Sequence, residues 1–133
     1  MLDLKFLEDE RIWFSPRSKR GFEIVIGGTD RAPDSSRLQL AEWLIENVSQ
    51  VRRTAEGYLN STVDRDALGN SEWWLEGIEF GRTSSDAPTE FDVVFATDEG
   101  GDWTECRLWV VRCTVTCEES VCCVAPIGFR TQW

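Results

Sequence analysis

Short hydrophobic runs with the period of a β-strand occupy much of the chain. Leu2, Leu4 and Phe6 alternate with charged residues, which is the pattern of a strand with one buried face. Other runs of β-branched and aromatic residues, bounded by Gly, Pro, Asp or Ser, also indicate strands. The expected strands are 2–7, 11–14, 22–26, 73–80, 91–96, 107–115 and 121–125. The last is expected to end at Pro126 and Gly128, which leaves 129–133 as a tail.

Between the third and fourth strands the period changes to that of a helix. Apolar residues recur three and four positions apart over 36–59, and the opposite side carries charged and amide side chains. The segment 33–36 supplies N-cap residues, and Ser36 with Gln39 has the spacing of a capping box. One helix of about six turns is expected here. Its buried face comprises Leu38, Ala41, Leu44, Ile45, Val48, Val51, Ala55, Tyr58 and Leu59.

The predicted order of elements is β-β-β-α-β-β-β-β. Consecutive strands with short loops pair antiparallel, and a single helix cannot serve the crossovers of a parallel sheet. We therefore expect an α+β fold: a curved antiparallel sheet of six to seven strands with one long helix packed on one face. The 133 residues are expected to form a single globular domain, because no repeat or linker divides them.

The charge of the chain limits its partners. It has 24 acidic and 14 basic side chains, a formal net charge of −10. Binding to a nucleic-acid backbone or to an anionic membrane depends on clustered Lys and Arg, so neither is an expected partner. A basic protein is the partner that this charge favours.

The chain contains no histidine, which removes the commonest catalytic base. Ser-His-Asp and Cys-His nucleophile systems are excluded, as is every metal site that needs imidazole. Phosphate-binding glycine loops and the G-x-S-x-G elbow of hydrolases are also missing. We expect no catalytic residues, no metal site and no cofactor.

The N-terminal segment gives an expectation about location. It is acidic and lacks the basic start and apolar run of a signal peptide. No stretch has the length and apolarity expected of a transmembrane helix. A cytoplasmic protein is therefore expected.

All five cysteines lie close together, between positions 106 and 123. Their spacing has no C-x2-C pair and no histidine completes a zinc site, so the favoured interpretation is small apolar residues in a sheet. A thiolate zinc site stays an alternative. A cross-strand disulfide, either Cys113–Cys123 or Cys117–Cys122, is the other. The five are Cys106, Cys113, Cys117, Cys122 and Cys123.

Acidic residues are concentrated in one predicted hairpin turn. Asp98, Glu99, Asp102 and Glu105 surround Trp103. Carboxylates about 5 to 9 Å apart can serve a glycosidase, and a cluster can bind Ca²⁺, but the order of a calcium hand is missing. A solvated turn without function is a further alternative. An apolar anchor ringed by negative charge suits a Lys/Arg-rich surface, so these five are the candidate partner-binding residues.

The seven tryptophans are more than a core of this size needs. Trp73 and Trp74 must point to opposite faces if both lie in a strand. Each tryptophan is either an amphipathic edge of the core or part of a contact surface.

The chain plan resembles small bacterial α+β domains of unknown function that often occur as immunity proteins in toxin–antitoxin-type loci. The features are the strand 22–26, a helix with Ala41 and Ala55 on its buried face, the strand entry 72–75 and the turn 101–103. The resemblance implies inhibition by binding rather than catalysis, and it carries over no catalytic residues.

The sequence therefore predicts an acidic, non-catalytic protein that neutralises a basic partner, such as a toxin, by covering its functional surface. One alternative is a structural subunit whose tryptophans and sheet edge form a homo-oligomer. Another is an enzyme that uses carboxylates or a cysteine thiolate. The oligomeric state is left open.

Overall fold

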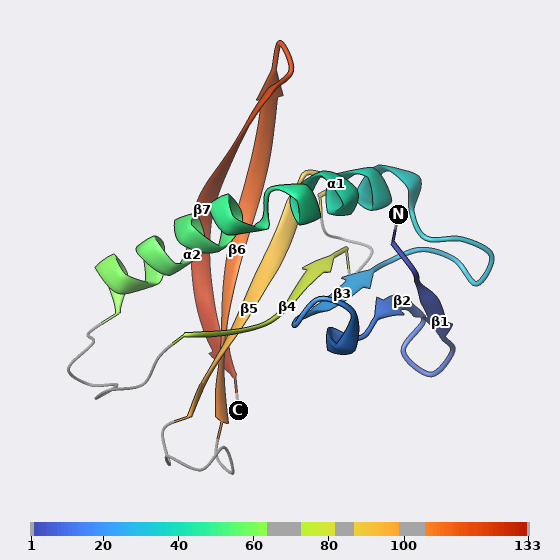
Figure 1. Ribbon diagram of the computed structural model, residues 1–133, viewed down its shortest axis with the longest axis horizontal. Coiled ribbons are helices and arrows are strands. Elements are labelled where there is room, and N and C mark those ends of the chain that lie inside the picture. The colour runs from blue at the N-terminus through green and yellow to red at the C-terminus, as the bar shows by residue number, and fades with distance from the viewer. Residues whose placement is uncertain (1, 64–72, 82–86, 99–105, 133) are drawn as a thin grey trace.

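The computed structural model describes residues 2–63, 73–81, 87–98 and 106–132. In this part of the chain seven strands form one sheet in sequence order, and two helices lie on the same face of it (Figure 1). The predicted α+β class is confirmed. The strands are β1 (Lys5–Leu7), β2 (Ile12–Ser15), β3 (Glu23–Ile26), β4 (Trp74–Phe80), β5 (Glu90–Asp98), β6 (Cys106–Glu118) and β7 (Val121–Gln132). The helices are α1 (Ser35–Glu46) and α2 (Val48–Thr62), and a short 3₁₀ helix, η1, covers Arg17–Lys19.

The sheet is mixed, because β3 and β4 pair in parallel. The prediction of a wholly antiparallel sheet is wrong at this pair. The two helices connect β3 to β4 and return the chain across the sheet, so the two strands run in the same direction. Ile24 then lies beside Ile78, and Ile26 beside Phe80. One helical crossover is enough for one parallel pair, although it cannot build a parallel sheet.

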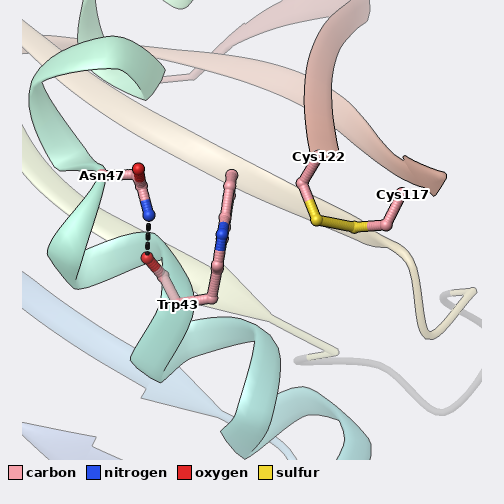
Figure 2. The surroundings of a disulfide bond; sticks show 4 residues. All are labelled: Trp43, Asn47, Cys117 and Cys122. Atoms are coloured by element: carbon pink, nitrogen blue, oxygen red, sulfur yellow. Dashed lines mark hydrogen bonds between the residues drawn. A yellow bond between two sulfur atoms is a disulfide. The ribbon is translucent and has the colours of Figure 1, made fainter. Parts of the chain in front are cut away.

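The predicted single helix over 36–59 is in fact two helices, with a break at Asn47. The backbone N–H of Asn47 donates to the carbonyl of Leu44 at 3.0 Å. Its side-chain Nδ2 donates to the carbonyl of Trp43 at 2.8 Å (Figure 2). An asparagine side chain that competes for backbone partners in this way interrupts a helix. Neither α1 nor α2 has the length and apolarity needed to cross a membrane.

The first helix also begins earlier than predicted, with Asp34 as its N-cap. The carboxylate of Asp34 accepts hydrogen bonds from the backbone N–H groups of Ser36 and Arg37. These are two of the donors that the first turn of a helix leaves unpaired. The capping role expected of Ser36 therefore belongs to Asp34.

The last strand does not end at Pro126 and Gly128, as predicted, but continues to Gln132. It is the edge strand of the described sheet, beside β6. Proline is tolerated in an edge strand where its missing N–H faces away from the neighbouring strand. A register shift opposite Arg112 and Cys113 absorbs one extra residue. The predicted tail therefore extends the sheet.

The hydrophobic core fills the space between the helices and the sheet. Phe80, Phe91 and Phe95 are its largest fully buried side chains. Trp73 and Trp109 are buried at its edge, and their indole N–H groups donate at 2.8 Å to Asn60 Oδ1 and Thr97 Oγ1. Both tryptophans thus have the role of an amphipathic core residue.

Of the roles predicted for the cysteines, two are seen: a cross-strand disulfide and a small buried residue of the sheet. Cys117 and Cys122 form a disulfide across β6 and β7, and the Trp43 side chain points towards it from α1 (Figure 2). Cys113 is buried as an apolar residue of the sheet, which confirms the favoured interpretation there. Cys123 is an exposed free thiol, so the alternative Cys113–Cys123 pairing is not formed.

Candidate partner-binding surface

The structure leaves the predicted acidic hairpin untested. The backbone of Asp98 ends β5 and pairs with Cys106. The side chain of Asp98 and the whole of Glu99, Asp102, Trp103 and Glu105 lie outside the described residues. The assignment of these five residues to partner binding stays a prediction.

A different acidic surface lies on the sheet face that neither α-helix covers, which we call the uncovered face. Side chains of a strand alternate between the two faces, so the strand register gives its residues. One row across β3 to β7 is Glu23, Gly77, Val94, Val110 and Arg130. The next row is Val25, Glu79, Asp92, Arg112 and Gly128.

The uncovered face contains a hollow of about 370 Å³, which we call the acidic hollow. Val25, Val94 and Val110 line it and are only 3%, 6% and 1% exposed. The charged lining residues are Glu23, Glu76, Glu79 and Arg130. The hollow therefore combines an apolar floor with a rim in which carboxylates predominate.

Ion pairs order the charged side chains of this face. Arg112 binds Asp92 in a bidentate manner, with Nε–Oδ1 at 2.7 Å and Nη2–Oδ2 at 2.9 Å. Arg130 Nη2 lies 3.5 Å from Asp92 Oδ2, and Arg17 pairs with Glu76. Among the residues that the structure describes, the carboxylates of this face are Glu23, Glu76, Glu79, Glu90 and Asp92, against the guanidinium groups of Arg17, Arg112 and Arg130. Negative charge is thus in excess here, in keeping with the whole chain.

Trp74 lies beside the acidic hollow and is 50% exposed. It lines a second depression of about 420 Å³, which shares Glu76 and Leu108 with the hollow. Trp73 precedes β4, is 8% exposed and belongs to the core, so the condition that both tryptophans lie in a strand is not met, although the two have different surroundings. Trp74 next to carboxylates has the combination that the sequence assigned to Trp103, an apolar anchor with negative charge around it.

One described thiol has a strongly shifted pKa. Burial, and secondarily the charge of Asp92, raises the pKa of Cys113 to about 12, so this residue is a thiol at neutral pH and a poor nucleophile. Among the described residues no three His, Cys, Asp or Glu side chains gather into a metal site. The uncovered face presents carboxylates, guanidinium groups and the indole of Trp74.

The sequence also contains a signal for this surface, apart from the acidic hairpin. Glu79, Asp92 and Arg112 each stand between two apolar neighbours within an expected strand. A charge within an interior strand indicates that one face of the sheet is not covered by a helix. This pattern indicates that an uncovered face exists, but it does not locate the hollow. The valines that line the hollow are distant from one another in the sequence.

No protein-family model, curated protein or solved structure matches this chain. The functional assignment therefore depends on the geometry and charge of the uncovered face.

Proposed function

We propose that the protein is a non-catalytic binding protein that neutralises a basic protein partner, as an immunity protein neutralises a toxin. The observation that carries the proposal is the acidic hollow beside an exposed tryptophan, in a chain of net charge −10. Lysine and arginine have an apolar stem and a cationic head. The exposed indole of Trp74 beside the hollow suits the stem, and the glutamates of the rim suit the head.

Charge and shape contribute to different stages of this binding. The net negative charge attracts a cationic surface over a distance and raises the association rate. At contact, Glu23 and Glu79 face the cationic heads, and Trp74 supplies the apolar area that dominates many protein interfaces. Acidic side chains on a toxin's cationic cleft would occupy the places of its anionic substrate groups. Inhibition then needs no chemistry by this protein.

The proposal keeps the expected cytoplasmic location. In that compartment Cys117 and Cys122 would be held as thiols, since cytosolic reductants open most disulfides. The disulfide lies at the end of the β6–β7 hairpin and lines neither the acidic hollow nor the depression beside Trp74. The proposed binding surface therefore does not depend on it.

The test uses two variants of equal net charge. Both replace three carboxylates by amides, so they differ only in which face loses negative charge. The site variant is Glu23→Gln, Glu76→Gln and Glu79→Gln. The matched control is Asp30→Asn, Glu42→Gln and Glu46→Gln, at exposed positions that do not line the hollow.

Wild type and both variants are immobilised, and a lysate of the source organism is passed over them at low salt. We expect one basic protein to bind wild type and the control in stoichiometric amount, to elute with salt, and to lose activity in complex. The site variant should not retain it. Equal retention by all three proteins would place the binding elsewhere, and a captured partner with undiminished activity would contradict neutralisation.

A further inference from the structure

The two edges of the described sheet differ greatly in length. The edge strand β1 has 3 residues, whereas the edge strand β7 has 12. Within the described sheet, β7 pairs with β6 on one side and with no strand on the other. An edge of this length presents a row of backbone N–H and C=O groups to any strand that can pair with it.

The register of β6 shows which groups of β7 face outwards. The backbone N–H of Val115 donates to Thr89 at 3.0 Å, on the β5 side, so it points away from β7. Main-chain direction alternates along a strand, and the register of β5 with β6 has no shift, so Val111 and Trp109 also point towards β5. Their partners on β7, Phe129 and Thr131, must then direct their backbone groups away from β6.

The hairpin end of β7 follows the same rule. Glu119 and Ser120 have φ of 49° and 71°, as in the two-residue turn that closes a hairpin. The Cα atoms of Cys117 and Cys122 are 4.0 Å apart, the close spacing of a pair without mutual backbone hydrogen bonds. The alternation then directs the nitrogen of Pro126 outwards. Pro126 therefore breaks no bond to β6, but it divides the outer edge into two pairing stretches.

The side chains of β7 are apolar and nearly uncharged. Val121, Ile127 and Phe129 are 66%, 53% and 37% exposed, three of the four large hydrophobic residues exposed in the described chain. Arg130 is the only charged residue between Val121 and Gln132. Edge strands that must not pair with another chain usually carry several charged side chains. The edge at β7 has one such charge, so an uncharged strand can pair with it.

Helix α2 favours a partner segment over a second copy of the chain. Figure 1 shows that α2 crosses β7 and continues beyond it, on the side away from β6. Tyr58 of α2 packs edge-on against Phe129, with ring centroids 6.2 Å apart. An added strand would lie beneath this helix. A second copy would place its own α2 in the same space, and its net charge of −10 would repel the first copy. Both effects oppose pairing of two copies at this edge.

We propose that the C-terminal part of the β7 edge binds an extended, uncharged segment of a protein partner. The segment would form an eighth strand through the backbone groups of Phe129 and Thr131. Backbone hydrogen bonds supply affinity in this mode, and alternate side chains pack against Tyr58 and Phe129. The inference goes beyond the proposed function, since it uses none of the carboxylates of the uncovered face.

The test is amide hydrogen exchange measured by NMR, with the acetylated and amidated peptide Ser-Thr-Val-Thr-Val-Thr-Ser as the probe. We expect exchange at Phe129 and Thr131 to slow about tenfold or more when the peptide is present. Exchange at Arg130 should not change, because its N–H already faces β6. In the peptide Ser-Thr-Pro-Thr-Pro-Thr-Ser the two prolines lack a backbone N–H and interrupt strand pairing, so it should have no effect.

Unchanged exchange at Phe129 and Thr131 up to the solubility limit of the peptide would overturn the proposal. So would slowing that appears without peptide and grows with protein concentration, because it would assign the edge to a second copy. The Thr131→Pro variant removes one outward donor and keeps the ladder to β6, so it should abolish the peptide effect. The Glu23, Glu76 and Glu79 variant should retain it, which separates this result from the test of the proposed function.

Discussion

At the scale of single residues, two glycines allow β3, β4 and α1 to meet. Gly81 has φ of +64°, and a Cβ there would lie 2.1 Å from Arg37 Nε. A Cβ on Gly27 would lie 2.1 Å from the carbonyl oxygen of Gly81. The backbone N–H of Gly27 donates to Phe80 at 2.8 Å, which fixes this approach. The buried Arg37 side chain therefore occupies the space that a Cβ at position 81 would need, so only glycine fits there.

Replacing Gly81 by alanine should lower the free energy of unfolding by about 2 kcal/mol or more, because a left-handed backbone and a steric clash add. Gly57 lies in α2, and a Cβ there meets nothing within 4 Å. The Gly57→Ala control should therefore raise stability by about 0.5–1 kcal/mol. Urea unfolding of both variants provides the measurement. Equal effects of the two substitutions would show that the packing around Arg37 is not the constraint.

The buried thiol of Cys113 links stability to alkaline pH. Burial is the main cause that raises its pKa to about 12 in the folded protein, from an ordinary value of 9.0. The folded state then holds a proton that the unfolded state loses, so its contribution to stability is complete below pH 9.0 and declines towards pH 12. The Cys113→Ala variant should show a shallower decline over this range. An identical slope in both proteins, measured by urea unfolding at each pH, would rule out this linkage.

At the scale of elements, periodicity predicted where the helix and strands lie but not where they are interrupted. The apolar spacing over 36–59 continues without a gap through Asn47, so nothing in the period marked the break. The break depends on one side-chain hydrogen bond to Trp43. In β7 the opposite error occurs, because the sequence pattern predicts that the strand ends at Pro126. A proline ends an interior strand but not an edge strand, and edge position is a property of the whole sheet.

The Cys117–Cys122 disulfide should stabilise the end of the β6–β7 hairpin and little else. It closes a short loop, for which chain entropy predicts a contribution of about 2 kcal/mol. Replacing both cysteines by serine should speed amide exchange near Thr116 and Cys123 and leave Val94 and Val110 protected. The Cys123→Ser variant, at an exposed free thiol, is the control and should change neither. Loss of protection at Val94 and Val110 would show that the disulfide supports the whole sheet.

At the scale of the molecule, the net charge could be read from the sequence, but the position of the candidate binding surface could not. The net charge of −10 is a property of composition and needs no fold. The acidic hollow requires Glu23 of β3, Glu76 and Glu79 of β4 and Val110 of β6 to meet. Glu23 pairs with Gly77, which lies between Glu76 and Glu79 in the sequence, because β3 and β4 pair in parallel; antiparallel pairing would give a different register. The error in topology therefore left this grouping of carboxylates unpredicted.

The proposed contributions of negative charge to association and of Trp74 to slow dissociation can be measured in the kinetics of binding to the captured basic partner. Long-range attraction acts on association and weakens with salt, whereas an apolar anchor acts on dissociation. The Glu23→Gln, Glu76→Gln and Glu79→Gln variant should associate more slowly and show a weaker dependence on salt. Trp74→Ala should keep both the association rate and its salt dependence but dissociate roughly thirtyfold faster, which corresponds to about 2 kcal/mol. If Trp74→Ala left dissociation unchanged, the anchor would lie elsewhere, and Trp103 would be the next residue to replace.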